Sequence, residues 1–213
     1  MIGGEEIWNE VYKSDNNFFG EEHSSFAIFC FNYIKSNDNI KKILDLGAGH
    51  GRDSIFFASN GFEVEALDYS DIAVKILANK AKEKRLPIKS LVFEIKKKPL
   101  PFSDDYFDVV YSHMLLNMRF TKNELHFILS EIKRVLKPKG FNFFSVRNHN
   151  DKFYGKGQEI EKGIYDINGF QIRFFHKNEI KSLALSEEFE ILEIKEDYEE
   201  PVTLYLVASK KRF

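Results

Sequence analysis

The sequence predicts a single α/β domain built on a doubly wound, mostly parallel sheet. Three observations indicate this class. Strand and helix patterns alternate along the chain, a glycine-rich turn joins an apolar strand to a helix, and an acidic residue ends the next strand. With 213 residues, 43% of them hydrophobic, the chain is long enough for one substantial core. We therefore expect one domain over residues 1–213.

The first elements surround the glycine-rich turn. An apolar strand is expected over 41–46, and a helix from residue 52 or 53 to 60, with Gly61 as its cap. A second strand ends at Asp68. Because strands and helices alternate, the two strands are expected to lie parallel in one sheet.

Apolar spacing predicts the next helix over 71–85, which Pro87 ends. Thr121, followed three residues later by Glu124, has the capping-box pattern that opens a helix over 124–136. The remaining expected elements are a helix over 176–186 and strands over 88–95, 107–112, 141–146, 189–194 and 203–209.

The glycine-rich turn is predicted to bind a nucleoside cofactor. Gly47, Gly49 and Gly51 allow positive φ and close approach of a ligand, although Gly51 has helix–strand packing as an alternative role. Their spacing differs from the G-x-G-x-x-G dinucleotide pattern. Asp45, two residues before the first glycine, would repel a pyrophosphate and attract an ammonium group. Its alternative role is to partner a turn or a helix dipole, but a carboxylate at an apolar strand end is costly without a cation.

Asp68 stands about 20 residues beyond the glycine turn, at the carboxyl end of a strand, where open α/β sheets bind ligands. Its two oxygens would accept hydrogen bonds from both ribose hydroxyls. The alternative is a solvated loop acid. Ribose is common to several cofactors, so Asp45 and the glycine spacing distinguish between them. Asp108 is expected to order the start of the fourth strand.

Composition excludes several classes. A formal net charge of −2 argues against an electrostatic nucleic-acid binder. No run of about 18 apolar residues and no signal-peptide pattern occurs, which predicts a soluble cytoplasmic protein that does not bind membranes. Cys30 is the only cysteine, so neither an internal disulfide nor a thiolate metal cage is expected.

Three motifs in this order resemble the class I S-adenosylmethionine-dependent methyltransferases over about residues 40–210. They are ILDLGAGHGRD at 43–53, LPFSDDYFDVV at 100–110 and VLKPKG at 135–140. The second is similar to the small-molecule ubiquinone-biosynthesis-like branch, and GRDS at 51–54 with GFEV at 61–64 is similar to the tellurite-resistance-type branch. Lys139 stands where the family usually has a glycine.

The resemblance implies a seven-stranded Rossmann-like sheet with an antiparallel last strand and an N-terminal helical segment. It divides the chain into a cap or lid over 1–39, a cofactor-binding half over 40–147, an insertion over 148–175 that shapes the acceptor pocket, and a C-terminal helix and strands over 176–213. The aromatic side chains of the N-terminal segment would either close over the cofactor or cover the sheet edge.

The implied cofactor is S-adenosyl-L-methionine, which leaves as S-adenosyl-L-homocysteine. Glu94 stands where the family usually places an Asp near the adenine amino group, and the Ile95 N–H would donate to an adenine ring nitrogen. The implied cofactor-binding residues are Asp45, Gly47, Ala48, Gly49, Asp68, Tyr69, Glu94, Ile95 and Ser112.

A small-molecule acceptor is expected by elimination within the family. After the fourth strand the chain lacks the Asn/Asp-Pro-Pro-Tyr run of nucleic-acid amino-methylating enzymes and the clustered acids of the metal-dependent type, and Cys30 lies in the N-terminal segment. His113 is the candidate base, with a packed wall of the cofactor pocket as the alternative. Candidate acceptor contacts are Asn117, Arg147, Tyr154 and Arg173; the two arginines would grip an anionic acceptor or be ordinary surface residues.

The sequence leaves two other functions open. A nicotinamide oxidoreductase would need its third glycine one residue later than Gly51. A methyltransferase-like protein that binds the cofactor without turnover, as a sensor or interaction subunit, is the principal alternative. The oligomeric state is not predicted.

Overall fold

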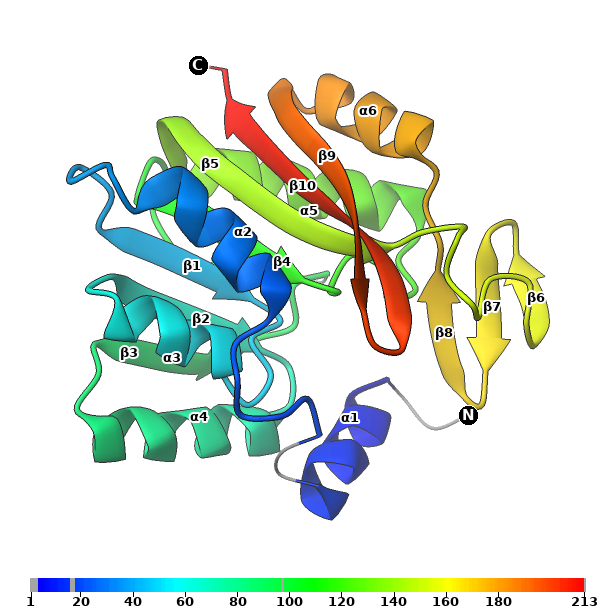
Figure 1. The fold of residues 1–213 in the computed structure, drawn as a ribbon, viewed down its shortest axis with the longest axis horizontal. Coiled ribbons are helices and arrows are strands. Elements are labelled where there is room, and N and C mark those ends of the chain that lie inside the picture. Colours follow the sequence, from blue (N-terminus) through cyan, green and yellow to red (C-terminus); the bar gives the residue numbers. More distant parts are fainter. Residues whose placement is uncertain (1–3, 16–17, 97, 213) are drawn as a thin grey trace.

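A seven-stranded sheet forms the centre of the molecule, with strand order β3-β2-β1-β4-β5-β10-β9 (Figure 1). The computed structural model describes residues 4–15, 18–96 and 98–212, so residues 1–3 and 16–17 of the expected cap lie outside the described residues. The strands are β1 (Lys42–Leu46), β2 (Glu63–Asp68), β3 (Ile88–Val92), β4 (Phe107–His113), β5 (Leu136–Arg147), β9 (Phe189–Glu199) and β10 (Val202–Lys211).

The pairing confirms the predicted fold class. Strands β1 to β5 pair in parallel, whereas β10 is antiparallel to both β5 and β9. From β1 the chain winds outward to β2 and β3, then returns to β4 on the other side of β1. The crevice outside the carboxyl ends of β1 and β4 is therefore the topological switch point, where open α/β sheets bind ligands.

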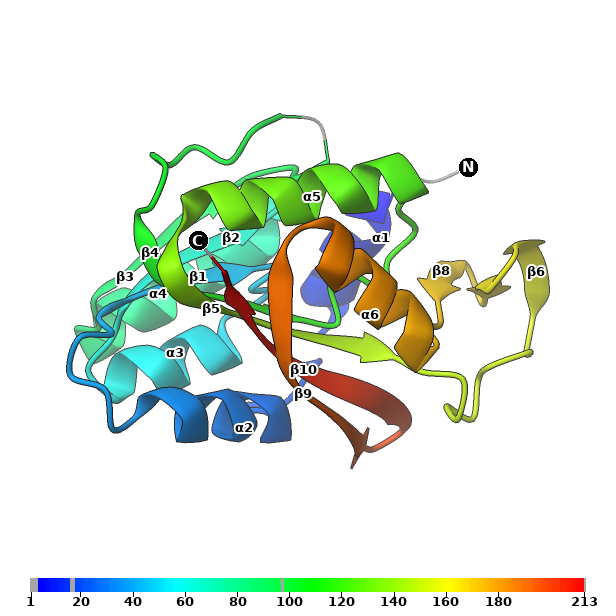
Figure 2. The ribbon, with the colours of Figure 1, turned by 90° about the horizontal axis from the view of Figure 1, so that it is seen from above.

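Helices cover both faces of the sheet (Figure 2). One face carries α2 (Ser25–Ile34), α3 (Arg52–Ser59) and α4 (Asp71–Lys84), and the other carries α5 (Lys122–Val135) and α6 (Lys177–Ser186). The short helix α1 (Gly4–Ser14) stands away from both layers, beside α4 (Figure 1).

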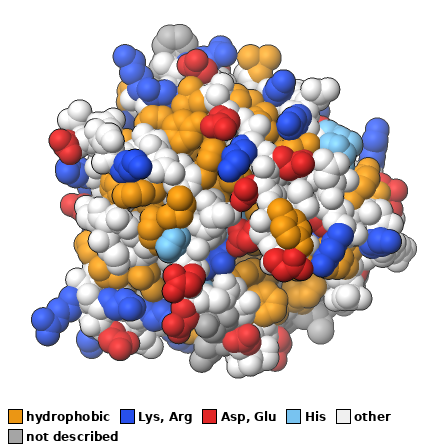
Figure 3. Space-filling view, in the orientation of Figure 1, with side chains coloured by type: hydrophobic (Ala, Val, Ile, Leu, Met, Phe, Trp, Pro, Cys, Tyr) orange, Lys and Arg blue, Asp and Glu red, His pale blue; other side chains and the backbone are white. Residues whose placement is uncertain are grey.

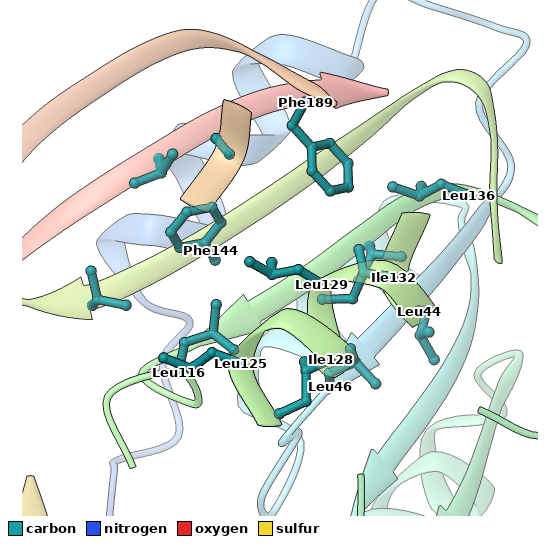
Figure 4. Packing of buried hydrophobic residues seen from close by; sticks show 14 of the residues in the cluster. Leu44, Leu46, Leu116, Leu125, Ile128, Leu129, Ile132, Leu136, Phe144 and Phe189 are labelled. Atoms are coloured by element: carbon teal, nitrogen blue, oxygen red, sulfur yellow. The ribbon is translucent and has the colours of Figure 1, made fainter. Parts of the chain in front are cut away.

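Each face has its own apolar core, because the inward strand residues alternate between the two sides. On the α5 side, Ile128 and Ile132 pack with Phe144 and Phe189, all nearly or fully buried (Figure 4). Around these cores the surface mixes both signs of charge on the face shown in Figure 3, in keeping with the small net charge.

Local features explain several boundaries. The capping box at α5 is present, with the Thr121 side chain accepting from the Glu124 N–H and the Glu124 carboxylate accepting from the Thr121 N–H. Asp108 does order the start of β4, because its Oδ2 accepts from the backbone N–H groups of Lys41 and Lys42, each at 2.9 Å. The expected third strand to Ile95 is too long, since β3 ends at Val92.

The insertion after β5 is more regular than the sequence indicated. It contains a separate antiparallel sheet, β6 (Gln158–Glu161), β7 (Ile164–Ile167) and β8 (Phe170–Arg173). Asn168 and Gly169 both have positive φ, +54° and +89°, which is the two-residue turn that an Asn-Gly pair favours between β-strands. This dipeptide was the available sequence signal for the hairpin.

Candidate functional site

The glycine loop lies at the switch point and is tied to the neighbouring strand. The N–H groups of Gly47 and Ala48 both donate to the Leu67 carbonyl oxygen, at 2.7 and 3.1 Å. Gly47, Gly49 and Gly51 have φ of +74°, +54° and +86°, so all three use backbone conformations that side chains disfavour. The loop is thus held in a fixed shape at the ends of β1 and β2.

Asp68 ends β2 beside this loop. Its Oδ2 accepts from the Gly49 N–H at 2.8 Å and its Oδ1 from the Ser70 N–H at 2.9 Å. Burial raises the pKa of Asp68, while the backbone hydrogen bonds from Ser70, Gly49 and Tyr69 lower it. A carboxylate has about four acceptor positions, so these three donors leave capacity for a hydroxyl donor.

Asp45 lies at the end of β1 and is 2% exposed. The Ser54 hydroxyl donates to its Oδ2 at 2.6 Å. Burial raises the pKa of Asp45 to about 8, opposed by the Ser54 hydrogen bond and reinforced by the negative charges of Asp53 and Asp68. A carboxyl group in this environment favours its neutral form until a cation approaches.

Beyond β3, Glu94 and Ile95 follow directly on Phe93, whose N–H donates to the Asp68 carbonyl oxygen at 2.8 Å. Both residues are half-buried. Tyr69 follows Asp68 on the same edge. The ends of β1, β2 and β3 therefore lie at one edge of the sheet. The predicted cofactor-binding residues Asp68, Tyr69, Glu94 and Ile95 follow or end these strands at that edge.

The end of β4 contributes polar groups that lack partners. The Ser112 hydroxyl and the Asn117 side-chain oxygen are buried and have no hydrogen-bond partner among the described residues. His113 stacks on Phe26 with ring centroids 5.5 Å apart, and its Nδ1 lies 2.7 Å from the Ser145 hydroxyl. Buried polar atoms without partners are rare in folded proteins, which suits a site completed by a ligand.

The two arginines of the predicted acceptor site have different surroundings. Arg147 is buried and donates to both carboxylate oxygens of Asp151, at 2.7 and 3.0 Å, so an internal acid already neutralises its charge. Arg173 on β8 donates its backbone N–H to the Asn117 carbonyl oxygen at 2.7 Å, while its Nε is buried and unpaired within the described chain. Tyr154 packs edge-on against Phe174.

Helix α1 covers the glycine loop. The Tyr12 hydroxyl lies 2.5 Å from the position that a Cβ on Gly49 would take, and Tyr12 is 4% exposed. Trp8 contacts Phe19, with centroids 5.9 Å apart, and Phe170 of β8 at 5.7 Å. The N-terminal aromatic side chains thus lie over the loop and reach the insertion.

His50, inside the loop, is 2% exposed, and neither ring nitrogen has a hydrogen-bond partner among the residues described. Burial lowers its pKa to about 4, with smaller contributions from Lys80 and Arg52. The ring is therefore neutral at physiological pH.

Within the described ranges, no group of three or more His, Cys, Asp or Glu residues is arranged to hold a metal ion. No helix in that part of the chain has the length and apolar character needed to cross a bilayer.

Comparison with known proteins relates part of this chain to methyltransferases. Residues 43–140 match the family described as a methyltransferase domain. The chain is 28% identical to a ubiquinone biosynthesis O-methyltransferase of Rickettsia akari over 162 residues, which cover 72% of this chain and 61% of the relative. The chain is therefore similar to methyltransferases in sequence, and its fold is the one found in solved S-adenosylmethionine-dependent methyltransferases.

Two solved structures share its fold. A SAM-dependent methyltransferase from Methanosarcina mazei has a TM-score of 0.76 at 22% identity, covering 89% of this chain and 98% of that one. The Burkholderia thailandensis 1,6-didemethyltoxoflavin-N1-methyltransferase, solved with S-adenosylhomocysteine, has a TM-score of 0.76 at 17% identity. The match covers 98% of this chain and 87% of that one. The first three curated relatives are matched over only 32%, 61% and 42% of their own lengths.

Proposed function

We propose that this protein transfers the methyl group of S-adenosyl-L-methionine to a small-molecule acceptor by in-line displacement. The observation that carries the proposal is the glycine loop held between two buried carboxyl groups, Asp45 and Asp68, at the switch point. The bound cofactor would supply an activated methyl on a sulfonium. The protein's part is then to bind, orient and exclude water.

The donor set fits this cofactor. Asp68 has remaining capacity to accept from a ribose hydroxyl, and Asp45 lies in a buried environment that favours pairing with an ammonium group. The N–H groups of Gly47 and Ala48 are already used within the fold, so they fix the loop. Glu94 and Ile95 remain the candidates for the adenine edge.

The acceptor would bind between α1 and β8, beside the end of β4. Trp8 and Phe170 approach each other there, and the unpaired polar atoms of Ser112, Asn117 and Arg173 come from the adjoining segments. Aromatic walls with a few polar groups are typical of small-molecule sites. A methylated small molecule is also what the names of the ubiquinone and didemethyltoxoflavin enzymes indicate for those proteins.

Calorimetric titration with S-adenosylmethionine tests the cofactor assignment. We expect one site per chain, weakened about 10- to 100-fold in Asp68→Asn because a charge-assisted hydrogen bond to ribose is lost. Glu65→Gln, on the same strand and paired with surface Lys89, removes one charge away from the loop and should bind normally. A folded wild-type protein that gives neither heat nor thermal stabilisation with the cofactor would refute the proposal.

The acceptor site is tested through Trp8, the only tryptophan of the chain. Phenols and N–H heterocycles added to the complex with S-adenosylhomocysteine should change its emission, and Phe170→Leu should weaken that response. Turnover is then measured with radiolabelled S-adenosylmethionine. Acceptor binding without any transfer would favour the alternative, a cofactor-dependent sensor.

A further inference from the structure

Glu199, at the end of β9, enters the site from a segment that no motif marks. Its Oε1 accepts from Arg52 Nη2 at 2.7 Å, and the two side chains are only 20% and 13% exposed. Arg52 opens α3 directly after the glycine loop, and its Nη1 also donates to the Phe19 carbonyl oxygen at 2.7 Å. The cofactor loop, the N-terminal segment and the C-terminal hairpin therefore meet at one guanidinium.

The other oxygen of Glu199 faces His113. His113 Nε2 lies 3.3 Å from Glu199 Oε2, yet both atoms are buried and neither makes an aligned hydrogen bond to a described residue. On the opposite side of the ring, Nδ1 is 2.7 Å from Ser145 Oγ, which also accepts from the Met114 N–H. When Nδ1 carries the ring hydrogen and donates to Ser145, Nε2 and Glu199 Oε2 are two acceptors with no donor between them.

The charge on Glu199 is secure. Burial raises the pKa of Glu199, but the His113 ring in its protonated form and the Arg52 guanidinium lower that pKa to about 2. A carboxylate therefore lies beside an imidazole at neutral pH, in a place shielded from water. The Glu199 carboxylate therefore stabilises the His113 ring when the ring gains a proton and becomes an imidazolium.

We propose that Glu199 is a positioning residue for His113, with Arg52 holding it, and that the acceptor is one that must lose a proton, such as a phenol or an N–H heterocycle. This inference rests on the proposed function. The acceptor atom forms a bond to the methyl carbon, the carbon–sulfur bond breaks with its electron pair going to sulfur, and the acceptor's proton moves to His113 Nε2. Glu199 stabilises the imidazolium until the proton passes to water.

The groups around His113 come from four elements. Phe26 of α2 stacks on the ring, Ser145 of β5 binds Nδ1, and Glu199 of β9 faces Nε2, with Arg52 of α3 behind it. Two further ionisable groups of this region are bound to each other, since the Tyr111 hydroxyl donates to Asp53 at 2.6 Å. Glu199 is thus the anion in direct contact with the ring.

The competing interpretation is that Glu199 merely ties the hairpin to α3 through Arg52. Ring ¹⁵N NMR of histidine-labelled full-length protein, with and without saturating S-adenosylhomocysteine, separates the two. We expect the ratio of doubly to singly protonated His113 rings between pH 6 and 8 to fall roughly three- to tenfold in Glu199→Gln. The His113 signals are assigned by their loss in His113→Asn.

Glu193→Gln is the matched control. It lies on the same strand, but its carboxylate accepts from the Tyr33 hydroxyl instead, so the His113 ratio should not change. Glu199→Asp keeps the charge but moves it away from His113 by the length of one methylene, so the ratio of doubly to singly protonated His113 rings should be intermediate. This variant replaces Glu199→Gln in the test if Glu199→Gln does not fold. An unchanged ratio in folded Glu199→Gln or Glu199→Asp would overturn the inference. Failure of S-adenosylhomocysteine to bind in calorimetry would instead count against the proposed function.

Discussion

Cofactor binding should release a proton from Asp45. The unliganded side chain has a pKa of about 8, so about 90% of it is protonated at pH 7. An ammonium group bound beside it would favour the carboxylate and displace that proton. We expect about 0.9 proton to be released for each S-adenosylmethionine bound at pH 7.

The same linkage fixes the pH dependence of affinity. An α-amino group keeps its own proton between pH 7 and pH 5.5. Over this range the affinity for S-adenosylmethionine should fall about 30-fold as the pH is lowered, because the Asp45 carboxyl group of the free protein becomes harder to ionise. Calorimetry in two buffers of different ionisation enthalpy measures the protons released. Asp45→Asn is expected to bind more weakly and to lose most of this dependence. A wild-type affinity that is constant over this range, with no buffer effect, would refute the pairing of Asp45 with a cation.

The unliganded protein should show the opposite trend in stability. Since the folded-state pKa of Asp45 is raised above its unfolded value, the folded state binds more protons from about pH 4 to pH 8. The contribution of Asp45 to the free energy of unfolding is present at low pH and is lost as pH rises through 8. The free energy of unfolding should change by at most roughly 1 kcal/mol per pH unit. Asp45→Asn should flatten this part of the unfolding curve measured against pH.

Two further predictions concern the scaffold. Gly51→Ala would place a Cβ 2.1 Å from Leu77 Cδ1 at a φ of +86°, and should lower the free energy of unfolding by about 2–4 kcal/mol in a urea titration. Gly61 has a φ of +90° with open space around it, so Gly61→Ala should lower the free energy of unfolding by only about 1 kcal/mol in the same titration. Arg147→Ala leaves Asp151 buried without its cation and should cost about 3 kcal/mol. A wild-type unfolding midpoint for this variant, with weaker acceptor binding, would instead restore Arg147 to the acceptor site.

The elements that the sequence predicted best are those with local causes. Asp45 and Asp68 follow from strand ends, and the Thr121 cap follows from a pattern of four residues. The seven-stranded sheet with an antiparallel last strand followed from the family resemblance, and the structure confirms it. Local signals were sufficient because parallel strands place all their carboxyl ends at one edge.

Contacts across long sequence separations were not predictable in this way. Glu199 meets Arg52 from 147 residues away, and only the antiparallel return of β9 and β10 brings them together. The roles of the two arginines also depended on partners that no pattern reveals, since Arg147 is paired with Asp151 inside the fold. A charged residue's partner is decided by tertiary packing, so its type and spacing alone did not assign its role.

The attachment of the glycine loop to β2 has a consequence for how ligands are bound. Because the Leu67 carbonyl and the Asp68 carboxylate already hold Gly47, Ala48 and Gly49, the loop's conformational entropy is lost during folding and not during recognition. The cofactor therefore meets a preorganised surface. Association should be fast and nearly free of slow rearrangement within the loop, and any slow phase seen on mixing would report the movement of α1 with Tyr12 away from Gly49.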